Sequence, residues 1–293
     1  HPPNPPELYG AVMAEAVSRV EIQAPERRRT FSMSIAATEE RDRGQPTSWS
    51  AAVDALAAGR SFDPTTKGLE YLDADASEAR RLFVLCAGNS DAFASSDHLA
   101  RSDTDPIHDP GQAWNALTVG AMTNKAVIHD PSWAGWSPVA PAGELSPWST
   151  TGVTFSDSWP LKPDVVFEGG NVVTNAAGAV DFPCADLSLL TTHFRPAEKA
   201  LVQSWATSAA TAQVARFAAL ISAEYPAYWP ETLRALVVHS AEWSPQMKAH
   251  IIVKTTQDLV TPIAQDHLRT QALENARKLN GDVATAHDEN PLG

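Results

Sequence analysis

Cysteine, positive charge and long apolar runs are all scarce in this sequence of 293 residues. Two cysteines, Cys86 and Cys184, are too few for a disulfide framework and lack metal-ligand spacing. The 22 Lys and Arg against 35 Asp and Glu give a formal net charge of −13, which argues against the basic face that nucleic-acid binding needs. No stretch approaches the roughly 18 apolar residues of a membrane span. We therefore expect no nucleic-acid partner and no membrane partner, and the sparse cysteine favours a reducing, cytoplasmic location.

The start of the sequence also lacks an initiating Met and the basic, apolar, small-residue order of a secretory signal. We interpret the chain as processed or as a piece of something longer. What is present is 43% hydrophobic residues, including nine Trp and nine Phe, which is ordinary for a globular protein with a sizeable core. The length fits one large α/β domain or two modest ones.

Apolar periodicity predicts alternating helices and strands. Helical spacing indicates helices over 8–20, 49–58, 208–224 and 230–241, and short apolar runs indicate strands over 30–36, 81–86 and 116–121. The stretch 90–112 is predicted to be a surface loop, and 129–181 to be loops and short strands. This alternation implies a parallel sheet covered on both faces. Because the sequence turns polar and Ala-rich after about residue 252, we expect one domain over 1–253 and a polar helical tail over 254–293.

One local pattern that could take part in catalysis is the apolar strand that ends in Ala87-Gly88-Asn89. Ligands of open α/β sheets bind at the carboxyl ends of parallel strands, and an Asn amide there can donate to developing charge on a substrate oxygen. Taken alone, Gly-Asn is also an ordinary left-handed turn.

A second pattern is Thr207-Ser208, directly before the predicted long helix. A Ser there has its side chain and backbone N–H at the positive end of the helix, which suits a nucleophile whose product is an oxyanion. The simpler interpretation is that Thr207 or Ser208 caps the helix.

Taken with their neighbours, these patterns resemble the subtilisin-like serine peptidases, the subtilases. The family's Gly-Thr-Ser-x-Ala pattern is matched by residues 206–210, with Ala206 in place of the Gly, and its Ala-Gly-Asn by residues 87–89. Further landmarks are in the family's order: Asn115-Ala-Leu-Thr-Val-Gly-Ala121, Ser146-Pro-Trp-Ser149-Thr-Thr-Gly152, Lys162-Pro-Asp-Val-Val166 and the closing Leu233-Arg-Ala-Leu-Val-Val-His-Ser240. Upstream, Ser32-Met-Ser-Ile-Ala36 resembles the strand that lines the substrate main chain.

The resemblance implies a three-layer, subtilisin-like α/β fold with a mostly parallel sheet, lacking the family's N-terminal strands and helices. It implies a serine endopeptidase in which Ser208 attacks the scissile carbonyl, while Asn89 and the Ser208 backbone N–H form the oxyanion hole. The partner would be a peptide or protein substrate. The residues expected to line the peptide channel and first specificity pocket are Ser34, Ile35, Ala36, Ala87 and Gly88.

The sequence departs from the family in lacking the triad Asp and His. No Asp-x-Gly pattern lies early in the sequence, and no His-Gly-Thr pattern is present. The family places both ahead of the helix that 8–20 resembles, so we expect a missing N-terminal segment of the same protein to carry them, and the isolated chain to be inactive or nearly so. The histidines weighed as a base are expected in surface or structural roles instead: His98, His108, His129, His193 and His239.

Two alternatives stay open. A degenerate subtilase could keep the groove as a non-catalytic peptide-binding module, which the Gly-to-Ala change at Ala206 mildly favours. An unrelated hydrolase or nucleotide-binding fold is weakened by the absence of Gly-x-Ser-x-Gly, Gly-x-Gly-x-x-Gly and Walker loops. Asp103, Asp105 and Asp109 lack the spacing of a calcium loop, so no metal site is placed and no cofactor is expected.

Overall fold

The computed structural model describes residues 4–37, 42–63, 70–71, 79–90, 97–152, 159–182 and 184–249. The chain divides into two compact units, residues 1–241 and 242–293. The helices and strands below all belong to the first unit. The predicted polar helical tail over 254–293 lies outside the described residues, and so does the predicted boundary at 253.

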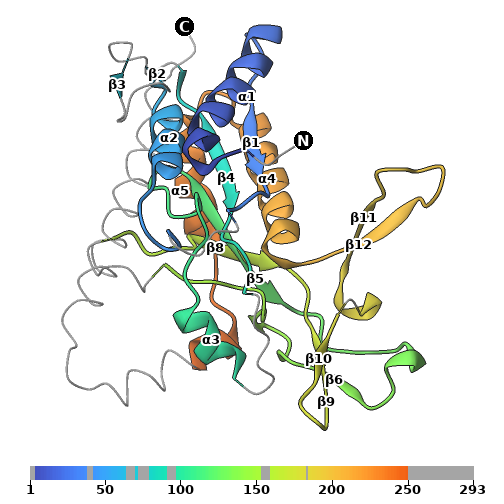
Figure 1. The fold of residues 1–293 in the computed structure, drawn as a ribbon. Coiled ribbons are helices and arrows are strands. Elements are labelled where there is room, and N and C mark those ends of the chain that lie inside the picture. The colour runs from blue at the N-terminus through green and yellow to red at the C-terminus, as the bar shows by residue number, and fades with distance from the viewer. Residues whose placement is uncertain are drawn as a thin grey trace, which may run out of the picture. The chain divides into compact units, whose positions relative to one another are not determined.

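A mostly parallel sheet forms the centre of the first unit (Figure 1). Three strands lie side by side and parallel in the order β1 (Thr30–Met33), β4 (Leu82–Cys86) and β5 (Leu117–Thr123). Strand β8 (Val165–Glu168) is also parallel to β5, whereas β7 (Glu144–Leu145) pairs with β5 in the antiparallel sense. All five residues of β4 are buried, as expected for a strand covered on both faces.

Helices cover both faces of this sheet. On one face, α1 (Tyr9–Gln23) and α2 (Ser48–Ala57) pack with Phe83 and Leu85 of β4. On the other face, α4 (Ala206–Glu224) and α5 (Pro230–Ser240) pack with Leu82 and Val84. The alternation of β4 side chains between the two cores follows from the two-residue period of a strand. The predicted three-layer α/β fold with a mostly parallel sheet is therefore confirmed.

Smaller elements surround the central sheet. They are β2 (Phe62–Asp63) with β3 (Glu70–Tyr71), the three-stranded sheet of β6 (Trp136–Pro138), β9 (Val173–Asn175) and β10 (Val180–Asp181), and the hairpin of β11 (Leu189–Thr192) and β12 (Leu201–Ser204). Single 3₁₀ turns occur at Pro6–Leu8, Pro131–Trp133 and Ala185–Leu187. The predicted loops and short strands over 129–181 are confirmed.

The prediction of a surface loop over 90–112 is wrong in part. Helix α3 (His98–Thr104) lies within it, and begins where the Asp97 side chain accepts a hydrogen bond from the Ala100 N–H. Residues 107–113 are buried rather than exposed. The sequence there is polar, but Ile107 and Ala113 fill the core, and Asp109 and Gln112 between them form hydrogen bonds inside it.

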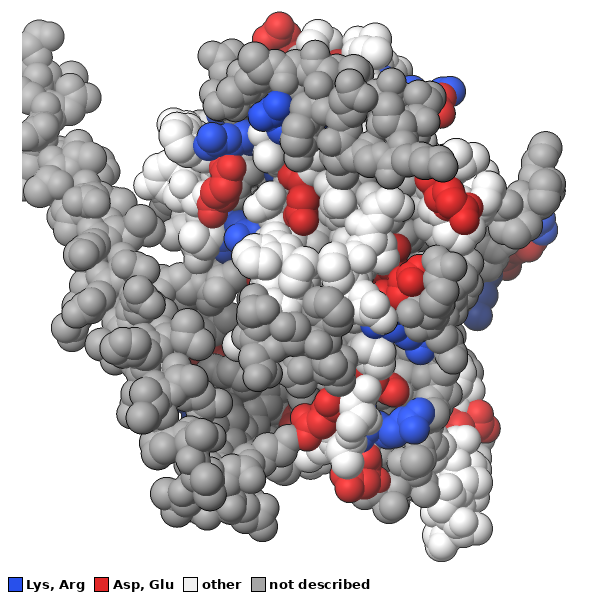
Figure 2. All heavy atoms as spheres, turned by 60° about the vertical axis from the view of Figure 1, so that its left-hand side comes forward, with Lys and Arg blue, Asp and Glu red and all other residues white. Residues whose placement is uncertain are grey.

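The acidic excess is not gathered in one area of the face that Figure 2 shows, where Asp and Glu side chains lie scattered among Lys and Arg. None of the helices in the described part of the chain has the length and apolar character needed to cross a bilayer.

Candidate active site

Ser208 lies in the first turn of α4, as the sequence predicts, and is half-buried. The residue before the helix, Trp205, gives no side-chain cap, so the capping interpretation of the Thr-Ser pair is wrong. The first N–H groups of a helix have no partner within it. Within the described residues, no acceptor lies opposite the Ser208 N–H, so this donor and the positive end of α4 are available to an anion.

Asn89 is held beside Ser208 by the intervening Thr207. Its Oδ1 accepts a hydrogen bond from the Thr207 N–H at 3.1 Å, and the Thr207 hydroxyl lies 2.7 Å away. The backbone donor fixes which end of the Asn89 amide is the oxygen. The Nδ2 end, with two N–H donors, is not used in these bonds. Sequence reasoning took Thr207 only as a possible cap and missed this positioning contact.

Ser34 completes the contact between β1 and α4. The Ser34 hydroxyl donates to the Ser208 carbonyl oxygen at 3.2 Å, and the Ser208 hydroxyl donates to the Ser34 carbonyl oxygen at 3.5 Å. Strands β1 and β4 are parallel, so the residues that follow them meet at one edge of the sheet. Ser34, Asn89 and Ser208, which are far apart in sequence, therefore lie at the same end of the sheet.

Main-chain groups at Ile35 and Ala36 are open to a ligand. Ile35 is 65% exposed, and Ala36 is half-buried. In the described part of the chain, neither residue forms a main-chain hydrogen bond through its N–H or C=O. The next residue, Ala37, donates its N–H to the Asp109 carbonyl and so anchors the segment. An extended peptide could pair with this segment as an added strand.

Ala87 and Gly88 are buried, and their carbonyls are already used. The Thr150 hydroxyl donates to the Ala87 carbonyl at 3.0 Å, and the Thr207 hydroxyl lies 3.0 Å from the Gly88 carbonyl. They can form a wall of the site through their atoms, but not through free carbonyls. Gly88 has φ +89°, and a Cβ built on it would lie 2.2 Å from Cγ of His108. Only glycine fits there.

Ala206 stands in a backbone conformation that favours glycine. It has φ +67° and is the one described residue other than glycine with positive φ. Its N–H donates to the Gly169 carbonyl at 2.6 Å, which fixes the turn from β12 into α4. A left-handed non-glycine residue costs of order 1–2 kcal/mol, so the surrounding structure must hold it.

No base accompanies the Ser208 hydroxyl among the described residues, where its acceptor is the Ser34 carbonyl rather than an imidazole. The described residues also contain no cluster of three potential metal ligands. Cys86, three residues before Asn89, is no rival nucleophile, because burial raises the pKa of its thiol and keeps it protonated. Within the described ranges, the site thus presents the Ser208 hydroxyl, the Ser208 N–H and the Asn89 amide, with no imidazole or carboxylate bonded to the hydroxyl.

Comparison with known proteins gives one family. The model of the subtilase family matches residues 2–278. No curated protein sequence matches significantly. Among solved structures, sphericase is 19% identical with a TM-score of 0.41, covering 80% of this chain and 55% of its own. The S41 psychrophilic protease is 21% identical with a TM-score of 0.40, covering 77% and 53%. The chain spans about half the length of these structures.

Proposed function

The chain belongs to the subtilase family, and on that premise we propose that it supplies the nucleophile and oxyanion hole of a serine endopeptidase of the subtilisin type. Ser208 attacks the scissile carbonyl, the amine product leaves, and water hydrolyses the acyl-enzyme. The Asn89 amide and the Ser208 N–H donate to the oxyanion. The observation that carries the proposal is the bonding of Asn89 Oδ1 to Thr207, the residue before Ser208, because it leaves the Nδ2 donors of Asn89 unused by Thr207.

The general base and its orienting carboxylate come, in this proposal, from a further segment of the same protein. A serine hydroxyl is a weak nucleophile until a base takes its proton. The isolated chain is therefore nearly inactive, with at most about 10³–10⁴-fold acceleration over water from the oxyanion hole and binding.

The substrate is a peptide or protein whose main chain pairs with residues 34–36. The open N–H and C=O groups of Ile35 and Ala36 support this, since strand addition needs unpaired main-chain groups. The wall formed by Ala87 and Gly88 then faces the side chain next to the scissile bond. The buried His108 ring lies against Gly88, so no side chain larger than that of glycine fits into the wall at this position.

One observation favours a second function, a non-catalytic peptide-binding module. The methyl group of Ala206, buried in a left-handed turn two residues before Ser208, is tolerable in a protein that binds peptide without forming an acyl-enzyme. Such a module would keep the pairing segment 34–36 and have no use for Asn89.

Peptide hydrolysis by the full-length gene product separates these functions. We expect Ser208→Ala to abolish turnover and Asn89→Ala to lower kcat by about 10²–10³, the cost of one oxyanion donor. Ser222→Ala, at the other end of α4, is the matched control and should leave turnover unchanged. Peptide binding without turnover, unaffected by Asn89→Ala, would establish the binding module instead.

A further inference from the structure

The hairpin of β11 and β12 stands clear of the helices in Figure 1, although it leads directly into α4. Its two strands pair with each other and with no other described strand. The last residue of β12, Ser204, is four residues before Ser208. Because a two-stranded hairpin is at best marginally stable by itself, its base has to be held by the body of the protein.

Both ends of the hairpin are anchored beside the candidate site. Leu187, before β11, is fully buried, and its carbonyl accepts a hydrogen bond from the Asn171 N–H at 2.9 Å. Trp205, after β12, packs against Phe182 with ring centroids 5.8 Å apart. These contacts fix the direction in which the hairpin leaves the protein, next to the first turn of α4.

One face of the hairpin carries exposed leucines. Thr192 lies opposite Leu201, and Leu190 is two residues before Thr192, so the three side chains share a face. Leu190 is 67% exposed and Leu201 is 45% exposed. Exposed apolar side chains that gather on one face are typical of an interaction surface.

The turn of the hairpin presents Phe194, which is 79% exposed. The His193 N–H donates to the Ala200 carbonyl at 3.1 Å and closes the turn. The Arg195 guanidinium lies over the Phe194 ring, 5.1 Å from its centroid, and donates to Glu198 at 3.1 Å. Because these contacts already hold the ring, binding an apolar partner costs little conformational entropy at this side chain.

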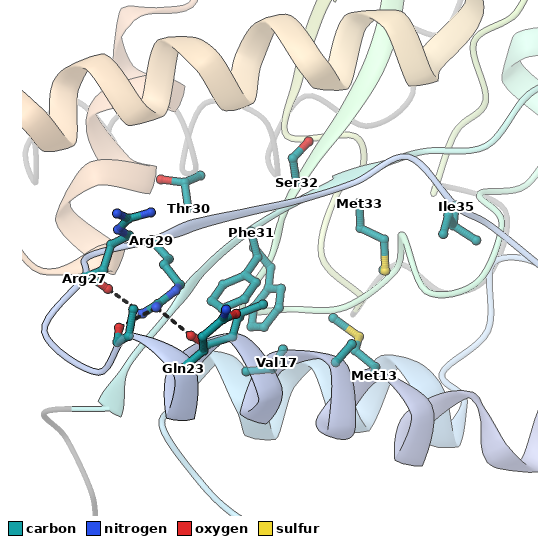
Figure 3. Close-up of a pocket in the computed structure, with 14 residues that line it drawn as sticks. Met13, Val17, Gln23, Arg27, Arg29, Thr30, Phe31, Ser32, Met33 and Ile35 are labelled. Atoms are coloured by element: carbon teal, nitrogen blue, oxygen red, sulfur yellow. Dashed lines mark hydrogen bonds between the residues drawn. The ribbon is translucent and has the colours of Figure 1, made fainter. Parts of the chain in front are cut away.

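The hairpin lies beyond the reach of a substrate residue at the scissile bond. Figure 3 shows Ile35, of the segment proposed to pair with substrate, beyond Met33, where the chain leaves β1. Figure 1 shows the hairpin extending from the start of α4 away from β1. Leu201 is three residues before Ser204, about 10 Å along the strand from the base of the hairpin. A substrate therefore reaches Leu201 only if its chain continues for several residues beyond the scissile bond.

We propose that Leu190, Phe194 and Leu201 form a hairpin exosite that binds an apolar stretch of a protein substrate, several residues beyond the scissile bond. This inference rests on the proposed function, because it requires Ser208 to cleave the bound chain. The occupant is the substrate because the hairpin is anchored beside Ser208, next to the path of a chain that pairs with residues 34–36. A second copy of this chain is disfavoured, since two chains with a formal net charge of −13 repel each other.

A matched pair of leucine variants tests the hairpin exosite. Leu190 is 67% exposed, and Leu161 is 68% exposed. Leu161 precedes Lys162, whose ammonium donates to the Ala116 carbonyl just before β5, so Leu161 lies at the end of the sheet opposite the candidate site. Leu190→Ser and Leu161→Ser therefore remove the same exposed side chain, and only Leu190→Ser removes it from the hairpin exosite.

The test compares hydrolysis of two substrates by the full-length gene product. One is casein, a long unfolded chain, and the other is a p-nitroanilide of the residues that precede a casein bond cleaved by the wild-type protein. The anilide has no residue beyond the scissile bond and cannot reach the hairpin. We expect Leu190→Ser to lower the ratio of kcat/KM for casein to kcat/KM for the anilide by about tenfold or more, and Leu161→Ser to leave this ratio unchanged.

An unchanged ratio in Leu190→Ser overturns the inference. Equal loss on both substrates would mean that the hairpin packs against another part of the protein. A wild-type dimer that Leu190→Ser dissociates, seen by sedimentation, would assign the hairpin to a second copy and also overturns it. If the wild-type protein cleaves neither substrate, the proposed function itself is rejected.

Discussion

Replacing Gly88 by alanine tests whether the backbone next to Asn89 is as closely packed as the structure indicates. A methyl group there meets two penalties. The φ of +89° is unfavourable for alanine, and the new Cβ would lie 2.2 Å from Cγ and 2.5 Å from Cβ of His108, which is buried and has little room to move. The left-handed backbone costs about 1–2 kcal/mol and overpacking adds about 1–3 kcal/mol, so we expect unfolding to be easier by about 2–5 kcal/mol.

The matched control for this substitution is Gly135→Ala. Gly135 has φ +84°, and no atom lies within 4 Å of a Cβ built on it. It therefore suffers the backbone penalty alone, about 1–2 kcal/mol. Urea denaturation followed by tryptophan fluorescence compares the two variants through their midpoints at a common slope. If Gly88→Ala costs no more than Gly135→Ala, the close contact between Gly88 and His108 is not present in solution.

Three further outcomes follow from particular contacts. Burial lowers the pKa of Lys162 despite the nearby carboxylate of Asp164, so at alkaline pH the unfolded chain binds more protons than the folded chain. The free energy of unfolding should therefore increase as the pH rises toward the ordinary lysine pKa of about 10.4. Denaturation of Lys162→Met at a series of pH values should lack this increase. Ala206→Gly relieves the left-handed strain but gives up a buried methyl worth about 0.8 kcal/mol, so its melting temperature should stay close to wild type; a large drop would contradict the positive φ. Glu21→Ala removes both hydrogen bonds between Glu21 and Arg81. It should lower the free energy of unfolding, measured by urea denaturation, by about 1.5 kcal/mol, whereas loss of an exposed surface ion pair lowers it by less than about 1 kcal/mol.

The central elements were predictable because their signals are local. The apolar run ending at Cys86 becomes the wholly buried β4, and the small-residue stretch after Thr207 becomes α4. Helix α3 escaped prediction because it is short, polar and started by one capping carboxylate, Asp97. The hairpin of β11 and β12 was not predicted, because the pairing of two strands is a contact that the hydrophobic periodicity of either strand does not reveal.

The sequence allows candidate residues of the site to be named, but not the contacts between them. The order of motifs singles out Asn89 and Ser208 as candidates, yet the contact that links them runs through Thr207. The mutual hydrogen bonds of Ser34 and Ser208 join residues 174 apart in sequence. Such contacts depend on the register of β1 against β4, which a single sequence does not encode in any local pattern. The positive φ of Ala206 is likewise set by the turn around Gly169.

Identification of the residue that a fluorophosphonate probe modifies in the full-length gene product, by mass spectrometry of its peptides, tests directly whether Ser208 is the nucleophile. We expect one adduct, on Ser208, that disappears in Ser208→Ala and forms more slowly in Asn89→Ala. We expect no adduct on the isolated 293-residue chain, in which the described residues place no base beside the Ser208 hydroxyl. A folded full-length product that is never modified at Ser208, or is modified at another serine, would contradict this assignment.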